Sequence, residues 1–182
     1  MNAAIDITGV VLNSERLILR PWQESDLDDF YAYAKVDGVG QMAGWLPHES
    51  IEVSKSILSS FIEGKKVFAI EYQGKAIGSL GVERYKESLF PELAEQKGRE
   101  IGYVLSKEYW GQGLMPEAVN AVLKWLFLKQ DLEFVMVGHF DWNHQSRRVI
   151  EKCGFKFLME TKHNTRYETV ENCRDYILTR ER

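Results

Sequence analysis

The N-terminal part of the chain changes from the two-residue hydrophobic period of a strand to the longer period of helices. Residues 15–22 (ERLILRPW) alternate apolar and polar positions, which predicts a strand. Apolar residues at helical spacing follow, and Ser25 with Asp28 three positions later predicts a capping box at the start of that helix. Residues 50–64 predict a second amphipathic helix, with Gly64 placed to end it.

The centre of the chain predicts a hairpin followed by a linking segment. Residues 65–85 contain two β-rich runs joined at Gln73-Gly74, a dipeptide typical of a hairpin turn. Residues 86–98 form a polar connector that we expect to be mobile. The hydrophobic pattern therefore places two adjacent antiparallel strands before this connector.

The second half of the chain alternates strand and helix patterns. A strand over residues 99–106 leads into a loop at 107–113, and a helix apolar nearly all round is predicted from about Met115 to Lys129. Further strand and helix patterns occupy residues 133–140, 143–154, 155–163 and 173–180. The order β-α-α-β-β-β-α-β-α-β-β predicts a mixed α/β fold with one sheet, in a single domain spanning residues 1–182.

Composition excludes several functional classes. The formal net charge of −4 argues against a dedicated nucleic-acid binder, which is usually basic. No stretch is long and apolar enough to span a bilayer, and the N-terminus lacks the pattern of a signal peptide. Cys153 and Cys173 lack the spacing of a zinc or disulfide pair and are expected to be buried. We therefore expect a cytoplasmic protein that uses no metal, no membrane and no nucleic-acid partner.

The segment GQGLMPE, residues 111–117, has the ingredients of an anion site. Gly111 and Gly113 precede a predicted helix N-terminus, whose free N–H groups and dipole favour a phosphate or pyrophosphate. Pro116 suits the first helical turn, where no N–H is needed. Taken alone, this pattern is equally typical of a tight turn, and the P-loop and Rossmann fingerprints are absent.

A second polar motif lies in DWNHQSRRVIEKCGF, residues 141–155. Asn143 is placed as a helix N-cap with Ser146 three residues later, and Gly154 follows the helix C-terminus. Helical spacing predicts an inward stripe of Ser146, Val149, Ile150 and Cys153 and an outward face of Arg147, Arg148, Glu151 and Lys152.

The two motifs together resemble the GNAT acetyltransferase superfamily and, within it, the ribosomal-protein N-acetyltransferase (RimJ/RimL-like) branch. The match rests on EIGYVLSKEYWGQGLMPEAV and NHQSRRVIEKCGF, and SERLILRPWQESDLDDFYAYA and GKAIGSLGV are similar to the branch's first strand, first helix and central hairpin. The resemblance covers nearly the whole chain. It implies a GNAT fold, a splayed, mixed and mostly antiparallel sheet flanked by helices, with acetyl-coenzyme A as co-substrate in the opening.

The resemblance also assigns contacts to the cofactor. The strand end of Val104, Leu105 and Ser106 matches the pantetheine-binding segment, where the backbone N–H of Leu105 would polarise the thioester carbonyl. Asn143 matches a residue that contacts the cofactor as well as capping its helix. The pyrophosphate-binding loop is matched by Gly111, Gln112, Gly113, Leu114 and Met115.

Two residues are candidates for catalysis. Glu100 matches a glutamate common in the branch and would accept the amine proton; the alternative is a carboxylate paired with Arg99 or Lys97. Ser146 matches the branch's candidate acid, with a serine that bonds backbone as the alternative. The position where many relatives carry a general-acid tyrosine is Ile150, so the thiolate is protonated from elsewhere or leaves unaided at its pKa of about 8.5.

The acceptor is a primary amine, and the branch favours a protein N-terminal α-amine, whose pKa of about 8 is lower than the 10.4 of lysine. A small-molecule amine (polyamine, aminoglycoside or amino-acid-like) and a catalytically idle acyl-coenzyme A binder stay open. A closed pocket lined by carboxylates would favour a polyamine, and an open groove a peptide. The resemblance places Tyr103 near the thioester and Trp45 in the loop that borders the acceptor site. The alternative for each residue is a side chain that packs in the body of the protein. The sequence leaves the oligomeric state open, a homodimer included.

Overall fold

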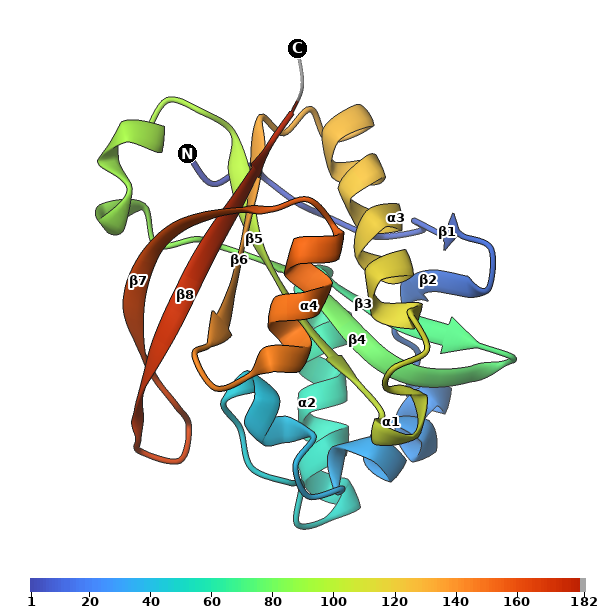
Figure 1. Ribbon diagram of the computed structural model, residues 1–182. Helices are drawn as coiled ribbons and strands as arrows, with labels where there is room; N and C mark the ends of the chain where they lie inside the picture. Colours follow the sequence, from blue (N-terminus) through green and yellow to red (C-terminus); the bar gives the residue numbers. More distant parts are fainter. Residues whose placement is uncertain (181–182) are drawn as a thin grey trace.

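The computed structural model describes residues 1–180 and builds them around one eight-stranded sheet. The strand order is β1-β2-β3-β4-β5-β6-β8-β7, and neighbours are antiparallel except for the parallel pair β5 and β6 (Figure 1). The strands are β1 (Leu12–Asn13), β2 (Leu17–Pro21), β3 (Val67–Tyr72), β4 (Lys75–Glu83), β5 (Gly98–Leu105), β6 (Phe134–Phe140), β7 (Lys156–Asn164) and β8 (Val170–Thr179).

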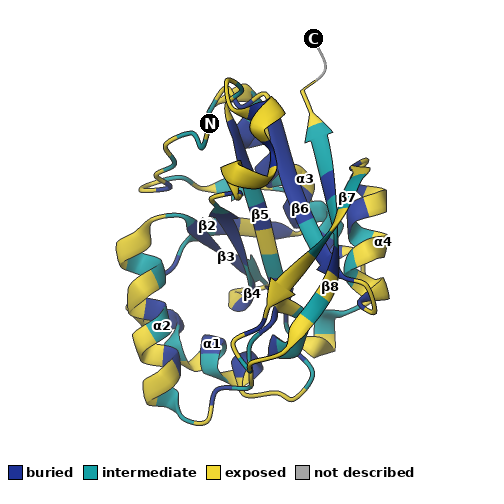
Figure 2. Cartoon of the chain, turned by 90° about the vertical axis from the view of Figure 1, so that its left-hand side faces the viewer, coloured by how far each residue is buried: buried dark blue, intermediate teal, exposed yellow. Residues whose placement is uncertain are grey.

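Helices lie on both faces of the sheet. The α-helices are α1 (Leu27–Ala34), α2 (Ile51–Gly64), α3 (Leu114–Leu128) and α4 (His144–Lys152). The 3₁₀ helices are η1 (Glu24–Asp26), η2 (Gly40–Ala43), η3 (Glu87–Leu89), η4 (Pro91–Leu93) and η5 (Lys107–Tyr109). Figure 2 shows α1 and α2 on one side of the central strands and α3 and α4 on the other. The predicted mixed α/β fold with one mostly antiparallel sheet flanked by helices is confirmed.

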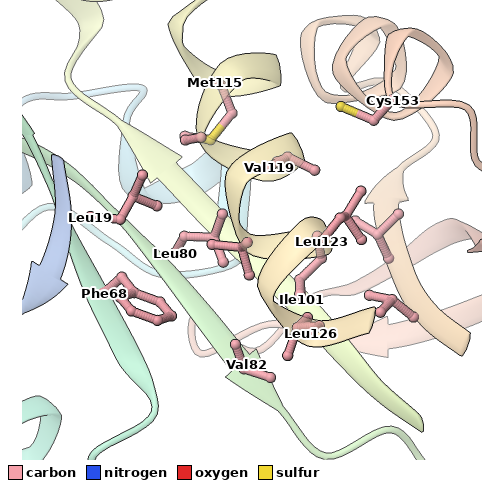
Figure 3. Close-up of a cluster of buried hydrophobic side chains, with 14 of the residues drawn as sticks. Leu19, Phe68, Leu80, Val82, Ile101, Met115, Val119, Leu123, Leu126 and Cys153 are labelled. Carbon is pink, nitrogen blue, oxygen red and sulfur yellow. The ribbon is translucent and has the colours of Figure 1, made fainter. Parts of the chain in front are cut away.

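The main core lies between α3 and the sheet, as Figure 3 shows. Buried residues of α3, including Val119, Leu123 and Leu126, meet Phe68 and Leu80 of the central strands. A second apolar cluster joins α1 and α2 to the opposite face. Burying α3 on nearly every side fixes the position of its N-terminus, and with it the loop that precedes it.

The sheet opens between β5 and β6. β5 pairs with β4 from Glu83↔Glu100 to its end at Gly78↔Leu105, whereas it pairs with β6 only from Gly98 to Ile101. β6 continues to Phe140 paired with β8 alone. The last residues of β5 therefore have one sheet neighbour, and their other edge faces an opening.

Several local predictions need correction. The capping box at the first helix is formed by Gln23 and Asp26, not by Ser25 and Asp28, because a 3₁₀ turn precedes α1. Gly64 is the last residue of α2, and Lys65 adopts the left-handed conformation that ends it. The strand β1 was not predicted, because its two residues are too few to show a hydrophobic period.

The connector over residues 86–98 is packed rather than loose. It contains η3 and η4, and its Phe90 and Leu93 are buried in a cluster with Tyr85, Phe134 and Met136. Most of the residues around Phe90 and Leu93 are polar, and for this reason the composition of the segment predicted a mobile connector. The connector thus forms a wall beside the open part of the sheet.

Candidate functional site

The free edge of β5 presents backbone groups to the opening. The Ser106 amide donates to the Ile77 carbonyl at 2.7 Å, which makes Leu105 and Gly78 a pair without direct hydrogen bonds in the antiparallel register. The N–H of Leu105 therefore points away from β4, toward the opening. The Leu105 carbonyl accepts from the Trp110 indole at 2.8 Å. The Leu105 N–H is therefore a backbone donor that faces the split.

A groove of about 900 Å³ runs along this edge, between the loop before α3 and the helix α4; we call it the loop groove. Among the predicted cofactor contacts, those that line it are Val104, Leu105, Gly111, Gly113, Leu114, Met115 and Asn143. Ser106 and Gln112 do not line it. The Ser106 amide is used by Ile77, and the Gln112 side chain donates to the Glu108 carbonyl at 3.0 Å.

The loop before α3 depends on its glycines. Gly111 and Gly113 both have a φ of +76°, in the left-handed region that other residues adopt at a cost, and Gly113 is the residue that caps α3. This turn leaves the first N–H groups of α3 beside the groove. Arg148 and Lys152 of α4 also line it, although their helix positions predicted an outward face. The groove therefore combines free amides with two cations, a suitable lining for phosphates.

A distant arginine holds this loop. Arg16 donates through Nε to Glu117 Oε2 at 2.8 Å and through Nη1 to the Gln112 carbonyl at 3.0 Å. Ser14 Oγ donates to Glu117 Oε1 at 2.7 Å. Arg16 Nη2 lies 3.7 Å from the place where a Cβ on Gly113 would be. The sequence carried no sign of this contact, because the partners are about a hundred positions apart.

A second hollow of about 1,390 Å³ lies over the other side of the opening, and we call it the strand cavity. Carboxylates from three strands line it: Glu83 of β4, Glu100 of β5 and Asp175 of β8. Burial, followed by the charges of Asp175 and Glu83, raises the pKa of Glu100 to about 7. The basic groups at its lining are Lys86, His139, Lys162 and His163.

Glu100 has no hydrogen-bond or ion-pair partner among residues 1–180. The pairing with Arg99 or Lys97 that the sequence left open is absent: Arg99 donates to the Ala3 carbonyl at 2.6 Å, and the Lys97 ammonium lies 3.7 Å from Asp131. Arg99 precedes Glu100 on a strand, so its side chain projects to the opposite face. Glu100 is thus left as an unpaired carboxyl facing a cavity.

Asp175 is a site residue that sequence reasoning missed. Thr161 Oγ1 donates to Asp175 Oδ2 at 2.8 Å, and burial raises the pKa of this carboxyl. Its Oδ1 lies 2.5 Å from where a Cβ on Gly138 would be, so the glycine makes room for it. No motif surrounds Asp175 in the last strand, and only the sheet order β5-β6-β8 brings it toward Glu100.

The two hollows meet at Tyr103 and Ser146, which line both, together with Met42. The two hydroxyl oxygens are 2.9 Å apart. Asn143 Oδ1 accepts from the Ser146 amide at 3.0 Å, and Asn143 Nδ2 donates to the Met42 carbonyl at 3.1 Å. The hydroxyl of Ser146 therefore bonds a side chain, not backbone as the alternative proposed, and the N-cap predicted at Asn143 is confirmed.

Two other positions considered in the sequence analysis have packing roles. Ile150, at the tyrosine position of many relatives, is 1% exposed in the main core. Trp45 packs against Gly40 and His48 and lines neither hollow. Within residues 1–180 no group of three or more His, Cys, Asp or Glu side chains is placed to hold a metal ion. The described helices also include none with the length and apolarity to cross a bilayer.

Known proteins share this architecture. Residues 16–156 match the model of the acetyltransferase (GNAT) domain family. A curated relative from Bacillus subtilis (strain 168), the N-acetyltransferase YoaA, whose role is uncharacterized, is 31% identical over 153 residues, which cover 80% of this chain and 82% of the relative.

Two solved structures illustrate the likeness in fold. The microcin C7 self-immunity acetyltransferase MccE, determined with acetyl-coenzyme A and AMP, superposes with a TM-score of 0.77 at 16% identity, covering 91% of this chain and 93% of that one. A ribosomal-protein-S5-alanine acetyltransferase from Vibrio fischeri gives a TM-score of 0.71 at 24% identity, covering 93% and 96%.

Proposed function

The chain belongs to the GNAT acetyltransferase family and is an acetyl-coenzyme A-dependent N-acetyltransferase, and from this premise we propose that its acceptor is the N-terminal α-amine of a protein or peptide. The observation that carries the proposal is Glu100, an unpaired carboxyl in the strand cavity with a pKa raised to about 7. A base with that pKa is matched to an α-amine.

The cofactor side of the proposal uses the loop groove. Gly111, Gly113 and the first amides of α3 hold the pyrophosphate, and Arg148 and Lys152 add positive charge beside it. The Leu105 N–H, which faces the opening, donates a hydrogen bond to the thioester carbonyl. This hydrogen bond becomes stronger as the carbonyl oxygen gains negative charge during the reaction. The acyl carbon then lies where the loop groove meets the strand cavity.

The acceptor side follows from proton affinities. Moving a proton from an α-ammonium of pKa about 8 to Glu100 is uphill by about one pKa unit, or roughly 1.4 kcal/mol. The same transfer from a lysine ammonium of pKa about 10.4 is uphill by more than three units, or roughly 4.6 kcal/mol. Glu100 is therefore a competent base for an α-amine and a poor one for lysine.

A second candidate acceptor is a small polycationic amine. The carboxylates of Glu83, Glu100 and Asp175 line one hollow and would attract several positive charges. Glu83 is already paired with Lys66 at 2.5 Å, however, which reduces the negative charge offered to a polyamine. The α-amine stays the better supported acceptor on this balance.

Coenzyme A release from acetyl-coenzyme A distinguishes the two acceptors. The panel holds short peptides with free α-amines, the same peptides with a blocked N-terminus and an internal lysine, and spermidine. We expect turnover with free α-amines, and a kcat/KM at least tenfold lower for the blocked peptides and spermidine. Faster turnover of spermidine than of every peptide would replace the peptide acceptor by the polyamine. Release without any acetylated amine in the panel would reject both.

A further inference from the structure

We propose that Asn2 is a positioning residue for the acceptor amine. It separates Tyr85, which precedes the connector, from Gly98, the last connector residue, and so sets the position of the wall that the connector contributes to the strand cavity. The inference rests on the proposed use of the strand cavity as the acceptor site, and it does not depend on which amine is accepted. Asn2 itself lines neither hollow.

The ladder between β4 and β5 stops where Asn2 is inserted. Its last pair is Glu83↔Glu100. The same register, continued by two residues, would place Tyr85 opposite Gly98. Asn2 lies between these two residues instead: it forms a parallel bridge with Gly98 on one side and bonds Tyr85 on the other. Since neighbouring strands lie about 4.8 Å apart, an inserted residue roughly doubles the separation of the two ends.

The side chain of Asn2 pairs with Tyr85 as a peptide group would. Its Oδ1 accepts from the Tyr85 amide at 2.9 Å, and its Nδ2 donates to the Tyr85 carbonyl at 3.1 Å. Nδ2 also donates to Glu87 Oε1 at 2.8 Å, and the Asn2 amide donates to the same oxygen at 2.6 Å. These bonds lower the pKa of Glu87. Both a donor and an acceptor are needed here, and a side-chain amide supplies them.

The backbone around Asn2 is fixed to the other end of the connector. The Gly98 amide donates to the Met1 carbonyl at 3.0 Å, and the Ala3 amide donates to the Gly98 carbonyl at 3.3 Å. Arg99, which is 8% exposed, donates through Nε to the Ala3 carbonyl at 2.6 Å. Figure 1 shows these first residues beside the connector and β5. Because the segment is bonded along both edges, it acts as a spacer of fixed width.

This spacing matters to the acceptor because the connector lines the strand cavity. The connector residues at its lining are Lys86, Leu89 and Phe90. Asn2 bonds the backbone of Tyr85, the residue directly before them, and thereby places the start of this wall relative to Glu100 on β5. Loss of the Asn2 bonds lets the wall shift and weakens the binding of the amine, while the loop groove, which the connector does not line, keeps its affinity for the cofactor.

Steady-state kinetics of Asn2→Leu test the proposal, with any amine that the wild-type enzyme accepts. Leucine keeps the approximate size of asparagine and removes the side-chain bonds to Tyr85 and Glu87. We expect the KM for the amine to rise about 5- to 20-fold, with kcat at saturation and calorimetric affinity for coenzyme A within about twofold of wild type. Asn120→Ala, on the exposed surface of α3, is the control and should match wild type.

Two variants and one exchange measurement test the hydrogen bonds directly. Asn2→Asp loses the donor and places a second carboxylate beside Glu87, so its KM should rise at least as much as that of Asn2→Leu. Glu87→Gln keeps an accepting oxygen and should stay within about threefold of wild type. Amide hydrogen exchange over residues 85–98 should become faster in Asn2→Leu, with exchange in α3 unchanged. An unchanged KM in Asn2→Leu, or an equal loss of coenzyme A affinity, would overturn the proposal.

Leu89→Trp separates this proposal from the assignment of the cavity. Leu89 is 42% exposed and lines the strand cavity, so a larger side chain there narrows the hollow without touching Asn2. A higher KM in Leu89→Trp with an unchanged KM in Asn2→Leu would reject only the role of Asn2. An unchanged KM in both variants would also reject the strand cavity as the acceptor site.

Discussion

The loop groove and the strand cavity share Tyr103 and Ser146, yet they are assembled from different kinds of groups. The loop groove offers backbone: the Leu105 N–H, the glycine turn and the first amides of α3. The strand cavity offers side chains, with carboxyls from β4, β5 and β8 and basic groups from β6 and β7. In the proposed function, backbone groups bind the part of acetyl-coenzyme A that is the same in every reaction cycle, and side chains determine which amine is accepted.

The contrast extends to how each region is held. The loop groove is fixed by a buried helix and by Arg16, so its shape is largely prepared before any ligand binds. In the strand cavity, Glu100 is unpaired among the described residues and Asp175 is bonded by one hydroxyl. Unpaired buried carboxyls are costly, and a cationic amine offsets that cost. Substitutions in the groove should therefore affect affinity, and substitutions in the cavity should affect rate and pH dependence.

Glu100→Gln should have the largest effect. Removing the base should lower kcat by about 100- to 1,000-fold and leave the affinity for acetyl-coenzyme A unchanged. Wild-type kcat/KM should rise with pH through about 7, where Glu100 becomes a carboxylate, and the variant should lack that limb. Glu83→Gln, its cross-strand neighbour, is the control and should lose less than about fivefold. Full activity of Glu100→Gln would remove Glu100 as the base.

Gly113→Glu should weaken acetyl-coenzyme A binding by about 100-fold, measured by calorimetry. The substitution places a negative charge beside the pyrophosphate and forces a residue with a side chain into a φ of +76°. Gly113→Ala has the backbone strain without the charge and should lose about tenfold or less. Equal losses in the two variants would assign the effect to strain alone, and unchanged affinity of Gly113→Glu would refute the loop as the pyrophosphate site.

Arg16→Ala should weaken coenzyme A binding by about tenfold, with kcat at saturation unchanged. The variant removes the bonds from Arg16 to Glu117 and to the Gln112 carbonyl, so the loop loses an anchor on the first strands. Ser14→Ala, which removes one hydrogen bond to the same carboxylate, should show a smaller loss in the same direction. A lower kcat with intact affinity would contradict the division between the groove and the cavity.

Asp175→Asn should move the acid limb of the pH profile to lower pH. The negative charge of Asp175 raises the pKa of Glu100, so neutralising it lets Glu100 ionise at a lower pH. The KM for a cationic amine should rise several-fold because one attracting charge is lost. Thr161→Val, which removes the hydroxyl bonded to Asp175, is the companion variant. An unmoved limb would show that Asp175 does not act on Glu100.

The smallest effect is on stability. Because the folded-state pKa of Glu100 lies above its ordinary value of 4.5, ionising Glu100 costs folding free energy as the pH rises from about 4 to 8. Glu100→Gln should therefore match wild type near pH 4 and exceed it at pH 8 by up to about 3 kcal/mol. Thermal unfolding at the two pH values checks this. A stability difference that does not depend on pH would contradict a raised pKa.

Contiguous segments were readable from the sequence. The spacing of hydrophobic residues predicted β5, the loop and α3 within one or two positions, because each is defined by neighbours along the chain. Gly111, Gly113 and Asn143 were found for the same reason: a turn or a cap is a local event with a local residue preference. Glu100 was found through its place in the EIGY motif, but its unpaired state was not.

Only the tertiary structure decided what lies across the opening. Asp175, Arg16 and the hydroxyl pair of Tyr103 and Ser146 acquire their roles from contacts between segments far apart in the chain. Hydrophobic period and composition report which face of an element is buried, and they carry no information on which polar side chains meet over it. The sequence by itself therefore determined the order of the main elements and the glycine turn before α3, and the folded sheet, through its split between β5 and β6, decided the charge and proton affinity of the cavity.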